Sequence, residues 1–244
     1  MRNIKLTIRY DGTGYSGWQS QRNTPTIQEA IQNAIKAITS EKVSLIGSGR
    51  TDAGVHAEAQ VANFKTRSKI PLANLKAAIN SKLPKDILIT HIEPAGPKFN
   101  AQKSAKSKLY RYTIMNSNDL DPLLRHFAAK VFYKLNIAMM RKAASYIVGR
   151  HDFRSFKATD GQEKNSVRTV KNIRIEKKGD LVYIYIEAGG FLYNMARNIV
   201  GTLVDVGRGR FKAGEVRDII SRKNIKFSGP TMPANGLCMV KVRY

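Results

Sequence analysis

The chain has 244 residues, 42% of them hydrophobic, which is enough for a buried core in one large domain or in two of moderate size. Lys and Arg number 42 against 18 Asp and Glu, and the formal charge of +24 favours a polyanionic partner, most commonly a nucleic acid. A membrane-spanning protein is disfavoured, because no apolar run approaches the roughly 18 residues that a spanning helix needs.

The remaining features of composition favour the cytoplasm. The basic residues are spread along the chain, which argues against an amphipathic helix on a membrane surface. The first residues alternate like a strand and lack the apolar core of a signal peptide. The single cysteine, Cys238, permits no internal disulfide, so nothing indicates an oxidising compartment.

Hydrophobic periodicity predicts the elements of the first half of the chain. They are strands at 3–10, 55–64 and 86–93 and helices at 26–38 and 71–83. The first helix has two candidate caps. Thr26 and Glu29 fit a capping box, or Thr24 is the cap with Pro25 at the first helical position.

The second half continues the same mixture. Its predicted elements are strands at 106–115, 126–133 and 236–244, helices at 136–149, 192–207 and 213–222, and a hairpin at 170–188 that turns at residues 178–180. Strict βαβ alternation is missing, so we predict an α+β fold of two similar subdomains with largely antiparallel sheets. Pro and Gly punctuate residues 94–100, and we place the boundary just beyond them, between domains at 1–104 and 105–244.

The motifs that resemble cofactor and metal sites lack the neighbouring residues that such sites require. Residues 12–17, GTGYSG, match the dinucleotide pattern G-x-G-x-x-G, but the next helix starts near residue 25 and Glu29 lies within it. The histidines are scattered, and the pair His56 and Glu58 lacks the P-C-x-x-C segment of zinc deaminases. We therefore expect no nucleotide cofactor and no metal.

One acidic side chain, Asp52, stands out in residues 47–58, GSGRTDAGVHAE. The glycines there allow left-handed backbone conformations that present Asp52 beside Arg50. An ordinary turn Asp that bonds its own backbone is one interpretation. The other is a functional carboxylate, because an anionic group locally repels the polyanion that so basic a chain attracts.

A strand and a helix offer further candidate residues. Alternation along the strand at 106–115 puts Lys106, Lys108, Tyr110 and Tyr112 on one face. That face is either a basic and aromatic surface for stacking unpaired bases or a set of half-buried strand residues.

The helix from residue 191 carries one polar stripe on an otherwise apolar surface. The stripe consists of Asn194, Arg197, Asn198, Gly201 and Asp205. It either faces water or, because so apolar a helix is largely buried, directs Arg197 into a cleft or towards an acidic partner.

Several stretches resemble, in order, those of the tRNA pseudouridine synthase A family. They are YDGTGYSGWQSQ at 10–21, TIQEAI at 26–31, GSGRTDAGVHA at 47–57, FNAQKSAKSKLYRY at 99–112, DFRSF at 152–156, VRTV at 167–170, FLYNMARNIVGTLVDVG at 191–207 and LCMVKVRY at 237–244. Asn100 and Gln102 depart from the more usual His and Arg, and Ala196 replaces a Val. These departures affect secondary RNA contacts and leave the Asp52 stretch intact.

The resemblance implies isomerisation of uridine to pseudouridine at positions 38, 39 and 40 of the tRNA anticodon stem-loop, without cofactor or metal. Asp52 would attack the sugar or the base, or remove a ribose proton. A carboxylate that a bound base shields from water needs a cation to stay ionised, and by resemblance that cation is Arg197.

The resemblance implies further roles in binding the uridine. Tyr110 would stack on the extruded uracil and help to move the C5 proton, and Leu237 would close the apolar side of the pocket. Arg50 would occupy the space that the flipped nucleotide leaves, while Lys106 and Lys108 bind phosphates.

The family resemblance also implies a homodimer whose protomers share one tRNA, and sheets that meet around a central active-site cleft. Two alternatives remain open from the residues. A non-catalytic RNA-binding protein would explain the charge but not Asp52. A pseudouridine synthase acting on ribosomal RNA would explain both, although the other matching stretches are those of the tRNA family.

Overall fold

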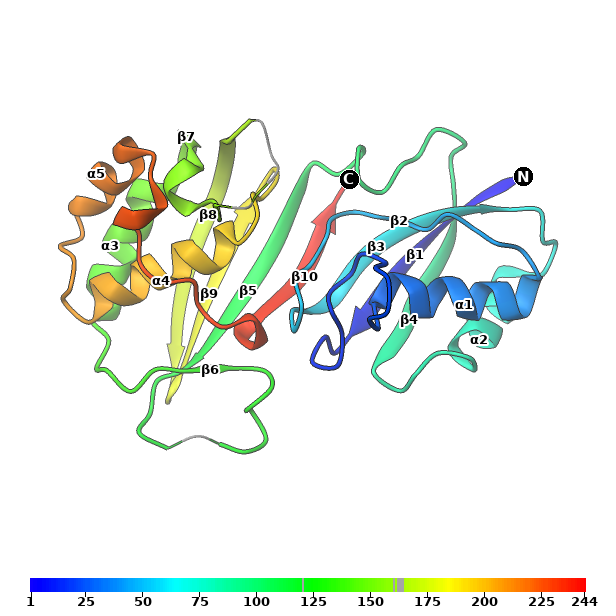
Figure 1. Ribbon diagram of the computed structural model, residues 1–244, viewed down its shortest axis with the longest axis horizontal. Coiled ribbons are helices and arrows are strands. Elements are labelled where there is room, and N and C mark those ends of the chain that lie inside the picture. The colour runs from blue at the N-terminus through cyan, green and yellow to red at the C-terminus, as the bar shows by residue number, and fades with distance from the viewer. Residues whose placement is uncertain (120, 160, 162–164) are drawn as a thin grey trace. The chain divides into compact units, whose positions relative to one another are not determined.

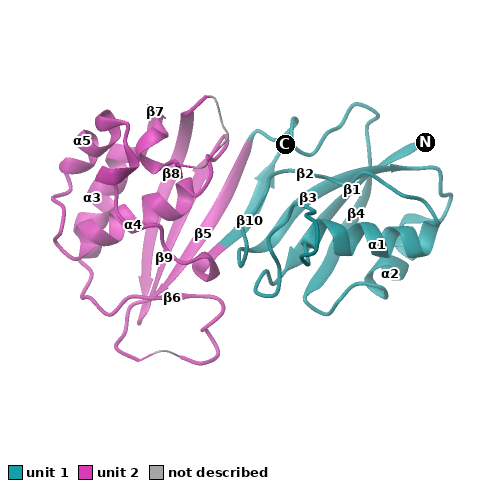
Figure 2. Cartoon of the chain, viewed as in Figure 1, with its two compact units in different colours: residues 1–106, 238–244 teal, residues 107–237 magenta. Residues whose placement is uncertain are grey.

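The computed structural model describes residues 1–119, 121–159, 161 and 165–244, and these form two compact units (Figure 2). Unit 1 comprises Met1–Lys106 and Cys238–Tyr244, and unit 2 comprises Ser107–Leu237. The end of the chain therefore groups with the N-terminal unit. The division into domains at 1–104 and 105–244 stays a prediction, since compactness does not show that either unit folds alone.

Unit 1 is a sheet with two helices. Its elements are β1 (Arg2–Tyr10), α1 (Ile27–Thr39), β2 (Ile46–Gly47), β3 (His56–Thr66), α2 (Leu72–Asn80), β4 (Ile87–Ala95) and most of β10 (Leu237–Arg243) (Figure 1). β1 pairs antiparallel with both β3 and β4, and β2 is antiparallel to β3. β10 runs parallel to β3, with Cys238 opposite His56. The last strand of the chain thus completes the N-terminal sheet beside the residue at which β3 begins.

The helix α1 is held to unit 1 by its apolar face. Ile27, Ile31, Ala34 and Ile35 are buried, and β1 contributes a matching row of buried side chains at Ile4, Leu6 and Ile8. Burying an isoleucine side chain stabilises a fold by about 1.5–3 kcal/mol. The predicted period of 3.6 residues for the helix and of 2 for the strand is therefore confirmed by the buried positions.

The predicted N-cap of α1 at Thr26 is right in position, but its capping hydrogen bond does not form, and the alternative cap at Thr24 is wrong. Thr26 is the N-cap by position, but its hydroxyl makes no capping hydrogen bond, and the first helical residue is Ile27 rather than Pro25. The loop before the helix supplies the missing acceptors, because the Ile27 and Gln28 amides donate to the carbonyls of Gly17 and Trp18 at 3.2 and 3.0 Å. Backbone carbonyls have taken the place of a side-chain cap.

Unit 2 consists of further strands covered by helices. Its elements are β5 (Ser107–Met115), β6 (Ala129–Lys130), α3 (Ile137–Ile147), β7 (Gly149–Asp152), β8 (Val167–Lys178), β9 (Leu181–Ala188), α4 (Met195–Gly207), α5 (Glu215–Arg222) and 3₁₀ turns at Phe153–Phe156, Ile225–Phe227 and Ala234–Gly236. The strand order is β5-β9-β8-β7, all antiparallel, with β6 parallel to β5. α3 packs on β8 and contacts both α4 and α5 (Figure 1). The predicted α+β class with largely antiparallel sheets is confirmed.

The predicted strand at 126–133 is largely wrong. Only Ala129–Lys130 forms a strand, as β6. Beyond it, the side-chain amide of Asn116 donates to the Val131 and Tyr133 carbonyls at 2.9 and 2.7 Å. A side chain therefore satisfies backbone groups that the alternating pattern assigned to a sheet. The hairpin turning at residues 178–180 is confirmed, and none of the described helices is long and apolar enough to cross a membrane.

Candidate active site

Asp52 is the first residue of a tight turn in unit 1. The Val55 amide donates to the Asp52 carbonyl at 3.2 Å, and Gly54 has a φ of 76°. A type II turn requires a positive φ at this third position, which explains the glycine. Thr51 and Val55 are buried, whereas Asp52 is half-buried and Arg50 is exposed. The turn therefore presents residue 52 between two buried residues, Thr51 and Val55.

The residue before Asp52 is fixed by the segment that follows β1. The phenol oxygen of Tyr10 lies 2.8 Å from Thr51 Oγ1, and both residues are buried. The Trp18 amide donates to the Thr51 carbonyl at 3.0 Å. Burial raises the pKa of the Tyr10 phenol, so the hydroxyl keeps its proton and remains available for the hydrogen bond at neutral pH.

The residues after Asp52 are held by the glycine-rich loop at 12–17. A Cβ on Gly12 would lie 2.1 Å from the Val55 carbonyl oxygen, so only glycine allows this approach. The Gly12 amide also donates to Nδ1 of the buried His56 at 3.0 Å. The loop whose glycines match a nucleotide-binding pattern thus packs its backbone against the Asp52 turn.

The aromatic residues of β5 are less exposed than the sequence pattern suggests. Tyr110 is 7% exposed, and its ring meets Phe191 edge-on with centroids 4.9 Å apart. Tyr112 is fully buried and donates its hydroxyl to the Pro233 carbonyl at 2.6 Å. The prediction of a shared surface is therefore wrong for Tyr112, which belongs to the core of unit 2.

The two lysines predicted for this strand differ in their surroundings, and only Lys108 lies within β5. Lys106 is exposed, whereas Lys108 is half-buried. Burial lowers the pKa of Lys108, and the nearby charge of Arg168 lowers it further. Leu237, at the start of β10, is 6% exposed.

Arg197 is the one residue of α4 that is not buried. Its Nε donates to the Met232 carbonyl at 2.6 Å, and its Nη1 donates to Asn194 Oδ1 at 2.8 Å. These bonds leave the guanidinium partly accessible but fix its plane. The prediction that this helix is largely buried is confirmed. That Arg197 faces a cleft or an acidic partner stays a prediction.

The other stripe residues within α4, Asn198, Gly201 and Asp205, are buried, so the interpretation that the stripe faces water is wrong for them. Asn194 is half-buried and precedes the helix as its N-cap. Asn198 is fully buried, donates to the Phe156 carbonyl at 2.9 Å and accepts from the Thr231 hydroxyl at 2.6 Å. Asp205 is 1% exposed and forms ion pairs with Arg208 at 2.7 Å and Arg210 at 3.1 Å. The side chains of Asn198 and Asp205 are thus both paired within unit 2.

Comparison with known proteins identifies the family. The family model described as tRNA pseudouridine synthase matches residues 6–102 and 143–244. The chain is a member of the tRNA pseudouridine synthase family. Proteins named tRNA pseudouridine synthase A from Thermoanaerobacter sp. and Acetivibrio thermocellus are 49% and 48% identical to it, and tRNA pseudouridine synthase A 2 from Clostridium perfringens is 49% identical. Each similarity covers 100% of both chains.

The family assignment confirms the resemblance seen in the sequence. The family match includes Asp52, Arg197 and Leu237, whereas Lys106, Lys108 and Tyr110 lie between its two matched segments. Among solved structures, a chain in a Cbf5-Nop10-Gar1 complex is similar over 96% of this chain and 57% of its own length, at 12% identity and a TM-score of 0.40. A likeness of that strength supports no further conclusion.

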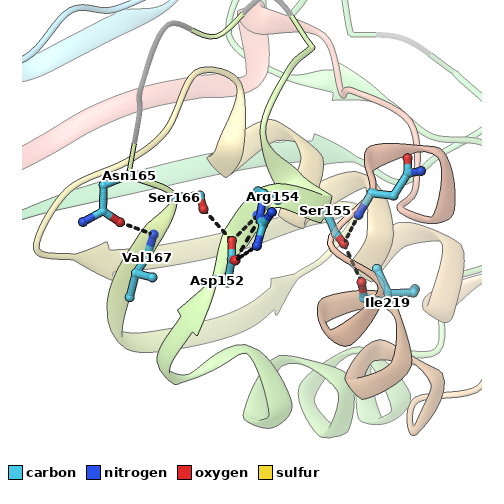
Figure 3. A network of polar contacts seen from close by, with 8 residues as sticks. Asp152, Arg154, Ser155, Asn165, Ser166, Val167 and Ile219 are labelled. Atoms are coloured by element: carbon cyan, nitrogen blue, oxygen red, sulfur yellow. Dashed lines mark hydrogen bonds and ion pairs between the residues drawn. The ribbon is translucent and has the colours of Figure 1, made fainter.

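A second polar network in this synthase surrounds the 3₁₀ turn after β7 (Figure 3). Asp152 accepts two hydrogen bonds from the Arg154 guanidinium, at 2.9 and 2.6 Å, and one from the Ser166 hydroxyl at 2.6 Å. The pKa of Asp152 is lowered to about 2, mainly by the hydrogen bonds from Arg154 and further by the bond from Ser166. The Ser155 hydroxyl donates to the Ile219 carbonyl at 2.5 Å, which ties this turn to α5.

Residues that could hold a metal are not gathered anywhere in the described ranges. Within 1–119, 121–159, 161 and 165–244, no three His, Cys, Asp or Glu side chains are arranged to bind a metal ion. The histidine closest in sequence to Asp52 is His56, and its Nδ1 is already engaged with the Gly12 amide.

Proposed function

We propose that this tRNA pseudouridine synthase isomerises the uridines at positions 38, 39 and 40 of the anticodon stem-loop. The bond from N1 of uracil to C1′ of the ribose breaks, and a bond from C5 to C1′ forms. The proton lost from C5 is balanced by one gained at N1, so the reaction needs no oxidant, phosphate donor or metal. The observation that carries the proposal is the half-buried Asp52 on a turn that lies between two buried residues, Thr51 and Val55.

Asp52 is the catalytic carboxylate in this proposal. It acts as nucleophile towards the sugar or the base, or as the base that removes a ribose proton. Arg197 pairs with it when the uracil excludes water, since an ionised carboxylate in such a site needs a compensating charge. The support for Arg197 is its partial exposure on an otherwise buried helix and a guanidinium held by Met232 and Asn194.

The remaining site residues bind the flipped uridine. Tyr110 stacks on the uracil and helps to transfer the C5 proton, and Leu237 closes the apolar side. Both side chains are more than nine-tenths buried, as residues that form the walls of a closed pocket should be. Arg50 is exposed and occupies the position that the target nucleotide vacates.

The lysines hold the RNA backbone. Lys108 and Arg168 are like charges close enough to affect each other, and a phosphate between them would relieve their repulsion. The exposed Lys106 adds a further phosphate contact. The enzyme works as a homodimer in the cytoplasm, with both protomers touching one tRNA.

Release of tritium from tRNA transcripts labelled at C5 of uridine tests the proposal. The assay is run in EDTA without added cofactor, on transcripts with a single labelled uridine at position 38, 39 or 40. Wild type should release tritium from each position, and the Asp52→Asn variant should release none. Release from other tRNA positions alone would contradict the assignment of the anticodon arm.

Two controls separate the alternatives. Tight tRNA binding with no tritium release from any transcript would indicate a non-catalytic RNA-binding protein. Release from ribosomal RNA fragments at a higher kcat/KM than from tRNA would favour the ribosomal substrate.

A further inference from the structure

We propose that Tyr10 and Thr51 form a positioning pair that sets the orientation of the Asp52 carboxylate. The inference rests on the proposed function, because it assumes that Asp52 acts on the uridine. Neither residue touches the substrate in this proposal. Both act through the peptide that precedes Asp52.

The first support is the geometry of the pair. The two hydroxyl oxygens are 2.8 Å apart, and both side chains are almost completely buried, at 3% exposure for Tyr10 and 6% for Thr51. A buried hydroxyl offsets its lost hydration only when it is paired, so removal of the Tyr10 hydroxyl takes this partner away from the buried Thr51 hydroxyl. The bond therefore fixes where Thr51 lies relative to β1.

The second support is that Thr51 is held through its backbone as well. The Trp18 amide donates to the Thr51 carbonyl at 3.0 Å, and a Cβ on Gly17 would lie 2.5 Å from that oxygen. The carbonyl belongs to the peptide whose nitrogen is that of Asp52. Side chain and carbonyl of Thr51 are thus both constrained, which leaves this peptide little freedom to rotate.

The third support is the constraint on the other side of the turn. The Val55 amide closes the turn onto the Asp52 carbonyl at 3.2 Å, and the Gly54 amide donates to the Tyr15 carbonyl at 3.4 Å. Asp52 therefore lies between two anchored points while its own side chain is half-buried. A turn held at both ends presents its first side chain in a restricted range of directions, and errors of about 1 Å in such placement can cost 10²-fold in rate.

The test is a double-mutant cycle on turnover with Tyr10→Phe and Thr51→Val. Each variant keeps the shape of its side chain and removes one hydroxyl. Each should lower kcat for tritium release about tenfold, while KM and the Kd for tRNA stay within about twofold. The double variant should be no slower than the worse single variant, because both changes break the same bond.

Two conservative variants serve as controls. Thr51→Ser retains the hydroxyl and should restore kcat to within about threefold of wild type. Tyr244→Phe also removes a tyrosine hydroxyl from unit 1, but one that donates to the Ala101 carbonyl at 2.9 Å instead of contacting Thr51, and should leave kcat unchanged.

Three results would overturn the inference: wild-type kcat in both single variants, losses that multiply in the double variant, or a fall in kcat that follows the unfolded fraction at the assay temperature. Asp52→Asn is measured in parallel. If that variant still turns over, the assignment of Asp52 fails. If it is inactive while Tyr10→Phe and Thr51→Val match wild type, only the positioning role fails.

Discussion

The Asp52 turn in unit 1 and helix α4 in unit 2 hold a candidate catalytic side chain in opposite ways. At Asp52 the neighbouring backbone is fixed, through Thr51 and Val55, and the carboxylate projects from it. At Arg197 the helix supplies a rigid base, and the guanidinium itself is fixed by the Met232 carbonyl and Asn194. A site held through its backbone should be sensitive to changes in its packing partners, whereas one held through its own side chain should be sensitive mainly to that side chain.

The largest effect is expected at the carboxylate itself. Asp52→Ala should lower tritium release by at least about 10³-fold, because no other group replaces the carboxylate in the reaction. Its affinity for tRNA should stay within a few-fold, since a single carboxylate contributes little attraction to a polyanion. Filter binding and single-turnover assays on the same preparation measure both quantities, and a parallel loss of binding would contradict the catalytic role.

The next effect separates chemistry from binding. Arg197→Ala should reduce kcat about 10²-fold with a smaller change in Kd, since the cation is needed once water is excluded. Lys106→Ala should do the reverse, raising Kd and reducing the slope of log Kd against log salt concentration by about one. Equal losses of binding in the two variants would remove the distinction between a catalytic and a phosphate-binding cation.

The same contrast explains which features could be predicted from the sequence. Periodicity predicted β1, α1, the hairpin and the burial of α4, because these depend on which side chains are apolar. It could not predict the contact between Tyr10 and Thr51, which are 41 residues apart, or the backbone carbonyls that replace a side-chain cap on α1. Such contacts depend on tertiary placement, and only the cluster of glycines at 12–17 signalled that a close backbone approach was needed.

The polar stripe of α4 shows a second limit of sequence reasoning. The pattern identified the right residues but not their environment. Asn198 finds its partners on distant segments, and Asp205 pairs with two arginines just beyond the end of the helix. Tyr112 shows the same limit. Alternation placed it on the same face as Tyr110, but its hydroxyl donates to the Pro233 carbonyl and its side chain is part of the core. The periodicity of a sequence predicts which residues share a face of a helix or strand. Whether that face is buried depends on the segments that pack against it.

Two glycine substitutions test whether the turn and the helix differ in rigidity. A Cβ on Gly201 of α4 would lie 1.8 Å from the Pro230 carbonyl oxygen, with the helix unable to move away from its buried surroundings. Gly201→Ala should therefore destabilise the protein by about 1–3 kcal/mol, which lowers Tm by several degrees in a chain of this size.

Gly12→Ala should displace the loop at 12–17 from the Asp52 turn. It should lower kcat at temperatures at which the variant is still fully folded.

Neighbouring glycines provide matched controls for this pair. Added Cβ atoms on Gly14 and Gly214 would meet no atom within 4 Å. Gly14→Ala and Gly214→Ala should therefore keep wild-type Tm and turnover. A Gly12→Ala variant that loses stability but keeps its kcat would show that the loop does not position the turn.

The smallest effect is a dependence of stability on pH at Asp152, far in sequence from both candidate catalytic groups. Its pKa of about 2 in the folded protein lies below the ordinary aspartate value of 3.8, so the ionised form stabilises the fold. That contribution is fully present above about pH 4 and is lost as the pH falls towards 2. Asp152→Asn keeps the shape of the side chain but removes the charge. It should lower the free energy of unfolding by about 1 kcal/mol at pH 6. This is less than the pKa shift alone suggests, because the Arg154 side chain is half exposed and water screens the ion pair. Urea unfolding of both proteins from pH 6 to pH 3 should show the difference shrinking at the acid end, and a constant difference would mean that the Asp152 charge is not what stabilises this turn.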